Sequence, residues 1–386
     1  MGSDKMQTIY LDNAATTFPK PDIVYDEMDY VNRNMCVNTG RGSYSLAREA
    51  TKIIDETKKA IAEMTKIGDA SKVVFTPSVT IAINEIFNGI KWSEGDIVFI
   101  SPFEHNSVAR TLEAITIHFG IKVMLMPLDD ENQIDLDGLK YELAKNQPKC
   151  ICMTHISNVT GYILPIESII EVASKYKPII VVDAAQSLGL LPIDLRKLSI
   201  DFLAFAGHKN LYGPLGIGGF IYNSKYILGE YITGGTGSDS LNTKMPNNIP
   251  GKYESASFNI VSIAGLNAAL KWSSGINDLY SHEKELSNYL IQKLRQIASV
   301  KLYLPGNLES HIGVVSFNIK GYAASDIGMI LDEDYGICVR TGYHCAPYIH
   351  KCIGSIESGG TIRIGLGYFN SKEQIDKLIN AINELL

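Results

Sequence analysis

Residues 178–187 read PIIVVDAAQS, and residues 201–209 read DFLAFAGHK. Both stretches contain an apolar run of strand length, which is typical of a strand that is buried on both faces of a sheet. Asp183 follows the first run, and Lys209 follows the second. The two stretches therefore predict two buried strands, with an acid just past one carboxyl end and a lysine just past the other.

The remaining sequence alternates between strand-like runs and helical periodicity from about Val73 onward. This alternation predicts an α/β fold with a mostly parallel sheet that helices cover on both faces. The further strands that we expect are 73–75, 97–100, 122–128, 150–155 and 218–221, with helices at 79–87, 108–119, 136–143 and 166–176. A second domain is expected to hold helices at 260–273 and 279–298, strands at 300–303, 314–318 and 361–364, and a final helix at 372–385.

Length, charge and cysteine content indicate the broad class of the protein. The chain has 386 residues, which is enough for two packed domains. Its net charge of −7 provides no basic excess for nucleic acid, and no apolar stretch has the length that spans a membrane. Six cysteines in a chain of this size do not suggest a disulfide scaffold, so we expect a reduced, cytoplasmic setting.

The acid and the lysine fit the chemistry of pyridoxal phosphate (PLP). A lysine binds this cofactor covalently, and an acid keeps its ring nitrogen protonated so that the ring can withdraw electrons from a substrate. An average lysine is a solvated surface charge, but Lys209 follows a buried run and precedes the glycine-rich stretch 213–219. Glycines let the backbone pass close to a ligand, and His208 could donate to a phosphate. We therefore interpret Lys209 and Asp183 as catalytic residues.

Residues 75–84 form a predicted junction from strand to helix. Backbone N–H groups at such a helix start, together with a threonine hydroxyl, bind anions well. An ordinary serine or threonine cap would leave the same pattern. The junction is thus a candidate phosphate site, with Val79 and Thr80 at its centre.

Cys345 lies in a loop bounded by glycine and proline, with Arg340 and His344 as neighbours. Positively charged neighbours favour the thiolate form that a nucleophile needs, whereas a lone cysteine is often only a small buried apolar residue. Cys338, His350 and Cys352 are also close in the sequence, but the spacings fit no common zinc motif, and we predict no metal site.

Residues 201–220 resemble the lysine signature of the class V, fold type I PLP enzymes. The resemblance extends from Leu11 to Arg363 and is strongest to the branch of cysteine desulfurases and selenocysteine lyases (SufS-like). It implies a PLP-dependent transferase fold with a large domain on a seven-stranded, mainly parallel sheet and a smaller α/β C-terminal domain. The domain limits that we expect are an N-terminal arm at 1–16, a large domain at 17–255 and a small domain at 256–386. The resemblance also implies a homodimer.

The resemblance assigns roles to further residues. His105 would stack on the PLP ring, Asn158 and Gln186 would lie beside its phenolic oxygen, and Ser257 would reach the phosphate from the other subunit. Arg363 would bind the α-carboxylate of an amino acid with the help of Asn158. The remaining residues expected at the substrate mouth are Ala14, Arg41 and Arg340.

The implied reaction is the conversion of L-cysteine to L-alanine, with the sulfur captured as a persulfide on Cys345. Lys209, Cys345, His105 and Asp183 would be its catalytic residues. Selenocysteine lyase, aminotransferase and epimerase reactions stay open on the same frame, as does a non-catalytic module with a PLP fold. A sulfur-acceptor protein is a possible partner, for example in iron–sulfur cluster assembly.

Three positions depart from the family pattern. Ala206 stands where many relatives have a hydroxyl residue that touches the phosphate, Ile81 replaces a common glutamate, and Gly40 stands where histidine is frequent. We therefore expect the substrate mouth and any docking surface for a sulfur acceptor to differ from those of well-known relatives.

Overall fold

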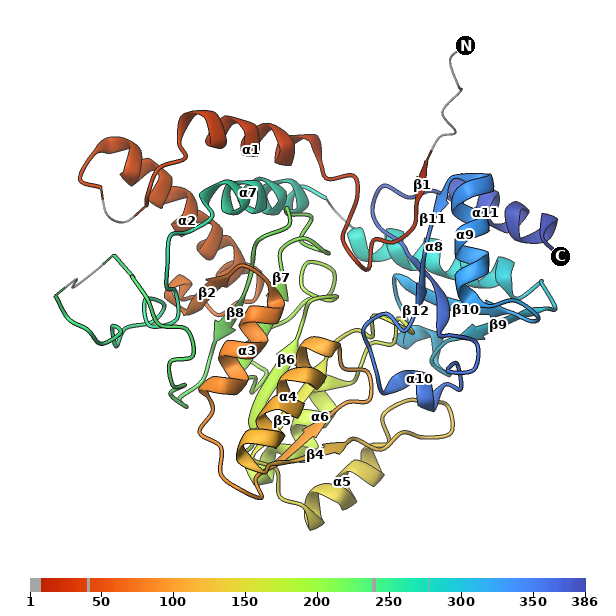
Figure 1. Ribbon diagram of the computed structural model, residues 1–386, viewed down its shortest axis with the longest axis horizontal. Coiled ribbons are helices and arrows are strands. Elements are labelled where there is room, and N and C mark those ends of the chain that lie inside the picture. The colour runs from red at the N-terminus through yellow and green to blue at the C-terminus, as the bar shows by residue number, and fades with distance from the viewer. Residues whose placement is uncertain (1–7, 40–41, 238–240, 277) are drawn as a thin grey trace.

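The computed structural model describes residues 8–39, 42–237, 241–276 and 278–386, so Gly40 and Arg41 lie outside the described residues. Within these ranges the chain forms a seven-stranded sheet, a four-stranded sheet and a two-stranded pair (Figure 1). The seven-stranded sheet lies with its helices on one side of the molecule, and the four-stranded sheet lies on the other, near both ends of the chain.

The large sheet has the strand order β2-β8-β7-β6-β5-β3-β4. Neighbouring strands run parallel except at β8, which is antiparallel to β2 and β7. The prediction of a seven-stranded, mainly parallel sheet is confirmed. The strands are β2 (Val73–Thr76), β3 (Ile97–Ile100), β4 (Lys122–Leu125), β5 (Cys150–Thr154), β6 (Ile179–Asp183), β7 (Phe202–Ala206) and β8 (Gly218–Tyr222).

Helices bury both faces of this sheet. In β5, Cys150 and Cys152 pack into the apolar core beneath α3 and α4, whereas Ile151 and Met153 pack into the core on the opposite face. Burial on both faces explains why the central strands read as unbroken apolar runs. The helices on the first face are α3 (Val79–Gly89) and α4 (Asn106–Phe119), and those on the second are α2 (Ser45–Met64), α5 (Leu136–Lys145), α6 (Ile166–Ala173) and α7 (Ile260–Ser274).

The four-stranded sheet is antiparallel, with the order β12-β13-β10-β9. Its N-terminal neighbour β1 pairs in parallel with β11, which brings the start of the chain against the C-terminal part. The elements of this part are β1 (Ile9–Tyr10), α8 (Leu279–Leu294), β9 (Val300–Tyr303), β10 (Val314–Ile319), α9 (Ala324–Tyr335), β11 (Ile337–Cys338), β12 (Arg340–Gly342), α10 (Ile349–Cys352), β13 (Thr361–Gly365) and α11 (Lys372–Glu384).

The domain limits stay a prediction. Helix α7 packs against α2 and α1 (Asp22–Asn34), and its Ile263 and Leu266 belong to the core of the large sheet. The sequence places this helix in the small domain, so its packing bears on where a limit would be drawn. None of the described helices is both long and apolar enough to cross a lipid bilayer.

Phe202 offers a test of the core beneath α3. Its ring is fully buried, with ring centroids 6.4 Å from Phe220 and 5.1 Å from Tyr222. Phe202→Ala would leave a cavity, so we expect the free energy of unfolding to fall by about 3–5 kcal/mol, measured by urea-induced unfolding. Ile117→Ala is the control, since Ile117 on α4 is 79% exposed and its loss should change stability by less than about 0.5 kcal/mol. Equal effects of the two substitutions would contradict the packing described here.

Candidate active site

Asp183 and Lys209 lie at the carboxyl ends of two adjacent parallel strands. Asp183 is the last residue of β6, and Lys209 follows β7 by three residues. Burial lowers the pKa of Lys209 to about 8, and the negative charge of Asp183 opposes this shift. Burial raises the pKa of Asp183. This rise is partly opposed by the N–H of Ala185, which donates to Oδ1 of Asp183 at 2.9 Å, and by the charge of Lys209. The amine is therefore far easier to deprotonate than an exposed lysine.

His105 caps the start of α4. The backbone N–H of Ser107 donates to its Nδ1 at 3.0 Å, so the neutral ring carries its proton on Nε2. Burial lowers the pKa of His105 to about 4, and the positive charges of Lys209 and Arg340 contribute to the shift. His105 is thus a neutral imidazole near Lys209, in a place from which it could stack on a ring or move a proton.

The start of α3 has the features of an anion site. Ser78 caps the helix by accepting from the N–H of Ile81 at 3.3 Å. Among the described residues no protein group pairs with the N–H groups of Val79 and Thr80, as is usual in the first turn of a helix. A Cβ on Gly218 would lie 2.9 Å from the nitrogen of Val79, so only glycine lets β8 pass this closely. These groups could hold a phosphate.

Asn158 and Gln186 tie distant segments to the end of the large sheet. The side-chain amide of Asn158 donates to the carbonyl of His344 at 2.7 Å, and that of Gln186 donates to the carbonyl of Ala14 at 2.7 Å. Both amides are buried. The loop that carries Cys345 and the N-terminal segment are therefore fixed to the loops that follow β5 and β6.

Arg363 is fully buried on β13. Its Nη2 lies 2.5 Å from Oδ1 of Asp12, and its Nη1 donates to the backbone carbonyl of Asn158 at 3.1 Å. Its Nε has no partner among the described residues, and burial lowers its pKa. Arg340 on β12 is its direct antiparallel partner, so two guanidinium groups stand on one side of the small sheet. Such a pair suits a carboxylate.

Cys345 is held in an unusual backbone conformation. His344 and Cys345 have φ values of +47° and +58°, in the left-handed region that residues other than glycine seldom adopt. The Nη2 of Arg340 donates to the sulfur at 3.2 Å, and the N–H of Asn106 donates to the carbonyl of Cys345 at 2.6 Å. The second bond joins the cysteine loop to the start of α4, one residue from His105. The thiol is thereby brought to the side of the sheet where Lys209 lies.

The other predicted residues differ in exposure and in their distance from this cluster. Ser257 is exposed, and its hydroxyl accepts from the side chain of Asn38 at 3.3 Å. Thr80 is also exposed. His208 is beside Lys209, and burial lowers its pKa to about 3, so it is neutral. The predicted Arg41 lies outside the described residues.

Asp12 and Glu104 contribute to the site, although the sequence alone predicted no role for either residue. Asp12, just after β1, pairs with Arg363 on β13, and its only sequence signal was its place in the segment that resembles the family. Glu104 is fully buried and accepts hydrogen bonds from the Ser101 hydroxyl and, at 2.7 Å, from the N–H of Thr154. It joins the ends of β3 and β5, and its position directly before His105 was its signal.

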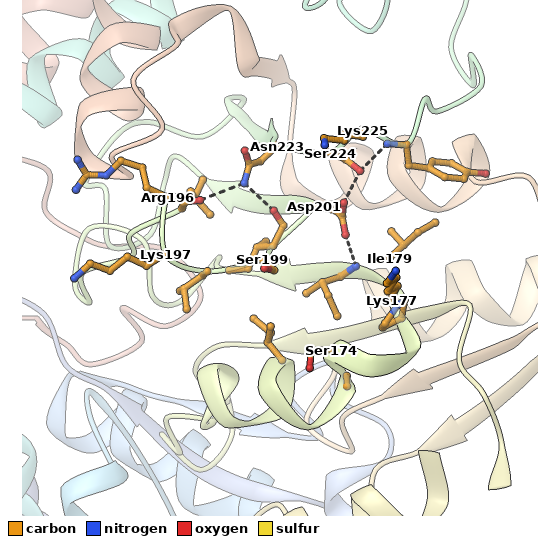
Figure 2. A pocket seen from close by; sticks show the side chains of 18 residues that line it. Ser174, Lys177, Ile179, Arg196, Lys197, Ser199, Asp201, Asn223, Ser224 and Lys225 are labelled. Atoms are coloured by element: carbon orange, nitrogen blue, oxygen red, sulfur yellow. Dashed lines mark hydrogen bonds between the residues drawn. The ribbon is translucent and has the colours of Figure 1, made fainter. Parts of the chain in front are cut away.

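A large groove lies at the other end of the strands, where the parallel strands β6 and β7 begin. It has a volume of about 620 Å³ and is formed by the segments that precede β6 and β7 and that follow β8 (Figure 2). Asp201 at its base accepts from the N–H of Ile180 and from the Ser224 hydroxyl, and Asn223 donates to the carbonyls of Leu195 and Ile200. Asp183, Lys209 and Cys345 are not among the residues that line this groove, so it is separate from the candidate site.

The described residues contain no group of three or more histidine, cysteine, aspartate or glutamate side chains arranged to hold a metal ion. The six cysteines, all described, are unpaired.

Glu104 provides a test by pH. Burial raises its pKa to about 8, so between pH 4.5 and 8 only the unfolded chain releases this proton. The wild-type protein therefore loses stability as the pH rises through this window. Glu104→Gln cannot ionise, so its free energy of unfolding relative to wild type should increase from pH 5 to pH 8, by at most about 1.4 kcal/mol per pH unit. Urea unfolding at pH 5, 6.5 and 8 measures this, and a pH-independent difference would contradict a buried neutral carboxyl.

Comparisons relate this chain to known proteins. The family described as Aminotransferase class-V matches residues 9–378. A protein named "Probable cysteine desulfurase" from Methanothermobacter thermautotrophicus is 32% identical, over 98% of this chain and 94% of that protein. The apo cysteine desulfurase from Thermococcus onnurineus NA1 has a TM-score of 0.90 at 29% identity, over 100% of this chain and 99% of that one. The cysteine desulfurase CsdA from Escherichia coli, in an S-sulfonic acid form, has a TM-score of 0.86 at 26% identity, over 98% and 95%. The chain therefore belongs to the class-V aminotransferase family.

Proposed function

We propose that this protein is a PLP-dependent cysteine desulfurase, which converts L-cysteine to L-alanine and captures the sulfur as a persulfide on Cys345. The observation that carries the proposal is the placement of the Cys345 thiol. Its sulfur accepts from Arg340 at 3.2 Å. It is also near enough to Lys209 and Arg363 that a negative charge on the sulfur would raise the pKa of both groups. These contacts support a site that combines a nucleophile, a cofactor lysine and a carboxylate-binding arginine. The relatives named as cysteine desulfurases support the same conclusion.

The residues present fit PLP. The unpaired N–H groups of Val79 and Thr80 would hold its phosphate, Lys209 would bind its aldehyde carbon, and Asp183 would pair with its ring nitrogen. When bound, PLP withdraws electrons from the bonds to the substrate α-carbon. His105, neutral over the physiological pH range, offers an uncharged face for the ring.

The substrate carboxylate would bind between the two arginines. The Nε of Arg363 has no partner within the described part of the chain, and Asp12 and the carbonyl of Asn158 fix the orientation of its guanidinium plane. Arg340 extends from the paired strand and also reaches the Cys345 sulfur. One end of the substrate is thereby held while its sulfur lies toward the cysteine.

The residues of the chain then carry out two transfers. Once the substrate amine has replaced it on the cofactor, the free Lys209 amine would take the α-proton of the substrate. Its lowered pKa of about 8 leaves this amine unprotonated in a good fraction of molecules near pH 8. The Cys345 thiolate attacks the substrate sulfur, the carbon–sulfur bond breaks, and the electron pair stays with the carbon, which then receives a proton. The balanced result is L-cysteine plus the Cys345 thiol giving L-alanine plus the Cys345 persulfide.

The assembly and its partners are part of the same proposal. We expect a homodimer in which Ser257, exposed in the single chain, reaches the phosphate of the other subunit. Exposed aromatic side chains near α1, among them Phe18 and Tyr30, support an interface there. A sulfur-acceptor protein would take the persulfide sulfur, and the unpaired cysteines are consistent with the expected reduced cytoplasmic setting.

Cys345→Ser tests the nucleophile. Serine cannot form a persulfide, so we expect alanine formation from L-cysteine to fall on the order of a thousandfold or more, while the absorbance of bound PLP is kept. Mass spectrometry should find an added sulfur on Cys345 of the wild type. Cys352→Ser is the matched control, because Cys352 is exposed and seven residues away, and it should keep full activity. Full alanine and sulfide production by Cys345→Ser would refute the assignment.

Arg363→Lys tests the carboxylate site. Lysine keeps the charge but not the two-pronged hydrogen bonding, and a hydrogen bond to a charged group contributes about 1.5–3 kcal/mol. We therefore expect KM for L-cysteine to rise roughly 10- to 150-fold in steady-state assays. Arg295→Lys, an exposed exchange, should leave KM unchanged. An unchanged KM in Arg363→Lys would mean that the carboxylate binds elsewhere.

A further inference from the structure

Tyr212 has a strained backbone three residues after Lys209. Its φ is +57°, and its side chain is only 1% exposed. A bulky residue in the left-handed region is an outlier that costs on the order of 1–3 kcal/mol and persists only where the surroundings hold it. The contacts of Tyr212 should therefore reveal what holds it.

The backbone of Tyr212 closes the turn that carries the lysine. The N–H of Tyr212 donates to the carbonyl of Lys209 at 2.7 Å, and the N–H of Gly213 donates to the carbonyl of Gly207 at 2.8 Å. Both bonds need the chain to reverse at Tyr212. The direction in which Lys209 leaves the backbone thus depends on the conformation of Tyr212.

The phenol of Tyr212 is held from the C-terminal part of the chain. The N–H of Tyr368 donates to its oxygen at 2.7 Å. The carboxyl of Glu283 on α8 lies near enough to this hydroxyl that the two groups shift each other's pKa. The ring of Tyr212 packs against Trp272, with centroids 5.1 Å apart, and against Phe369. Tyr212 therefore joins the lysine turn on the large sheet to the segment that follows β13 of the small sheet.

Glu283 lines a small cavity next to the lysine turn. The residue is 1% exposed, burial raises its pKa to about 8, and its Oε1 has no partner among the described residues. The cavity is about 10 Å³, close to the space of one water molecule, and Gln186 and Asn210 also line it. Asn210 in turn donates to the carbonyl of Gln186 at 2.6 Å. The site is polar and of the right size for a water that bonds to Glu283.

We propose that Tyr212 and Glu283 are positioning residues through which the C-terminal part of the protein fixes the Lys209 turn, with one internal water completing the hydrogen bonding of Glu283. The inference deepens the proposed function, because it rests on Lys209 being the cofactor lysine. The pair touches neither substrate nor cofactor. It acts by keeping a strained turn in the single conformation that aims the amine into the site.

Hydrogen exchange in the cofactor-free protein tests the turn directly. In Tyr212→Phe the ring stays, but the hydroxyl that accepts from the N–H of Tyr368 and lies beside Glu283 is lost, so we expect amide exchange in the 207–213 segment to become at least tenfold faster. Glu283→Ala should give the same local rise. Glu283→Gln keeps an acceptor for the phenol and should restore most of the protection. The remaining segments of the large sheet should exchange as in the wild type.

Tyr253→Phe is the matched control for a general loss of stability. Tyr253 is 5% exposed, and its hydroxyl donates to the carbonyl of Leu228 at 3.1 Å, away from the lysine turn. If Tyr212→Phe left exchange at 207–213 within twofold of wild type, or if Tyr253→Phe accelerated it equally, the proposal would be overturned. A Glu283→Gln variant as fast as Glu283→Ala would also refute it.

Cofactor binding separates this inference from the proposed function. Equilibrium titration with PLP should give a dissociation constant about tenfold higher in Tyr212→Phe than in wild type, because the amine is no longer held in place. An unchanged constant in Tyr212→Phe would count against the positioning role alone. If instead Lys209→Ala still bound PLP covalently, the proposed function would fail while the exchange result on the turn would stand.

Discussion

The site depends on the burial of a lysine next to an acid. Taking either charge out of water is costly, and each one lowers the cost of the other, so removing one partner would leave an unpaired buried charge. This is visible in the opposing effects on Lys209, whose pKa burial lowers and Asp183 raises. The arrangement requires β6 and β7 to be adjacent and parallel, because only then do both residues leave the sheet at the same edge.

Two arginines from the C-terminal part of the chain provide the positive charges that would bind a substrate beside Lys209 and Asp183. Arg340 and Arg363 face the same region from paired strands, and both lower the pKa of Lys209 further. Asp12, 351 residues before Arg363, balances one of these charges. The two arginines and Asp12 together leave one positive charge, which suits the carboxylate of a substrate. The N-terminal segment, the large sheet and the small sheet therefore have to meet before the site exists.

The sequence predicts those parts whose signal is local. The limits of β6 and β7 agree with the predicted runs because strands buried on both faces are continuously apolar. Strand β12 was missed, since its three residues include two polar ones and a glycine at the edge of an antiparallel sheet. The pairing of Asp12 with Arg363 leaves no local pattern at all. Glu104 was overlooked for a related reason, because an acid in a loop is ordinarily solvated, and only its contacts across two strands show its burial.

Two residues keep a left-handed backbone where their side chains contact the rest of the proposed site. Tyr212, with a φ of +57°, lies in the turn that carries Lys209, and Cys345, with a φ of +58°, lies in the cysteine loop. Glycine would adopt either conformation without cost, yet it would remove the phenol that meets Glu283 or the thiol that meets Arg340. Each strained residue is held by hydrogen bonds from another part of the chain, Tyr212 from Tyr368 and Cys345 from Asn106. At both positions a strained backbone is kept by hydrogen bonds from another part of the chain, which indicates that the side chain is required at the site.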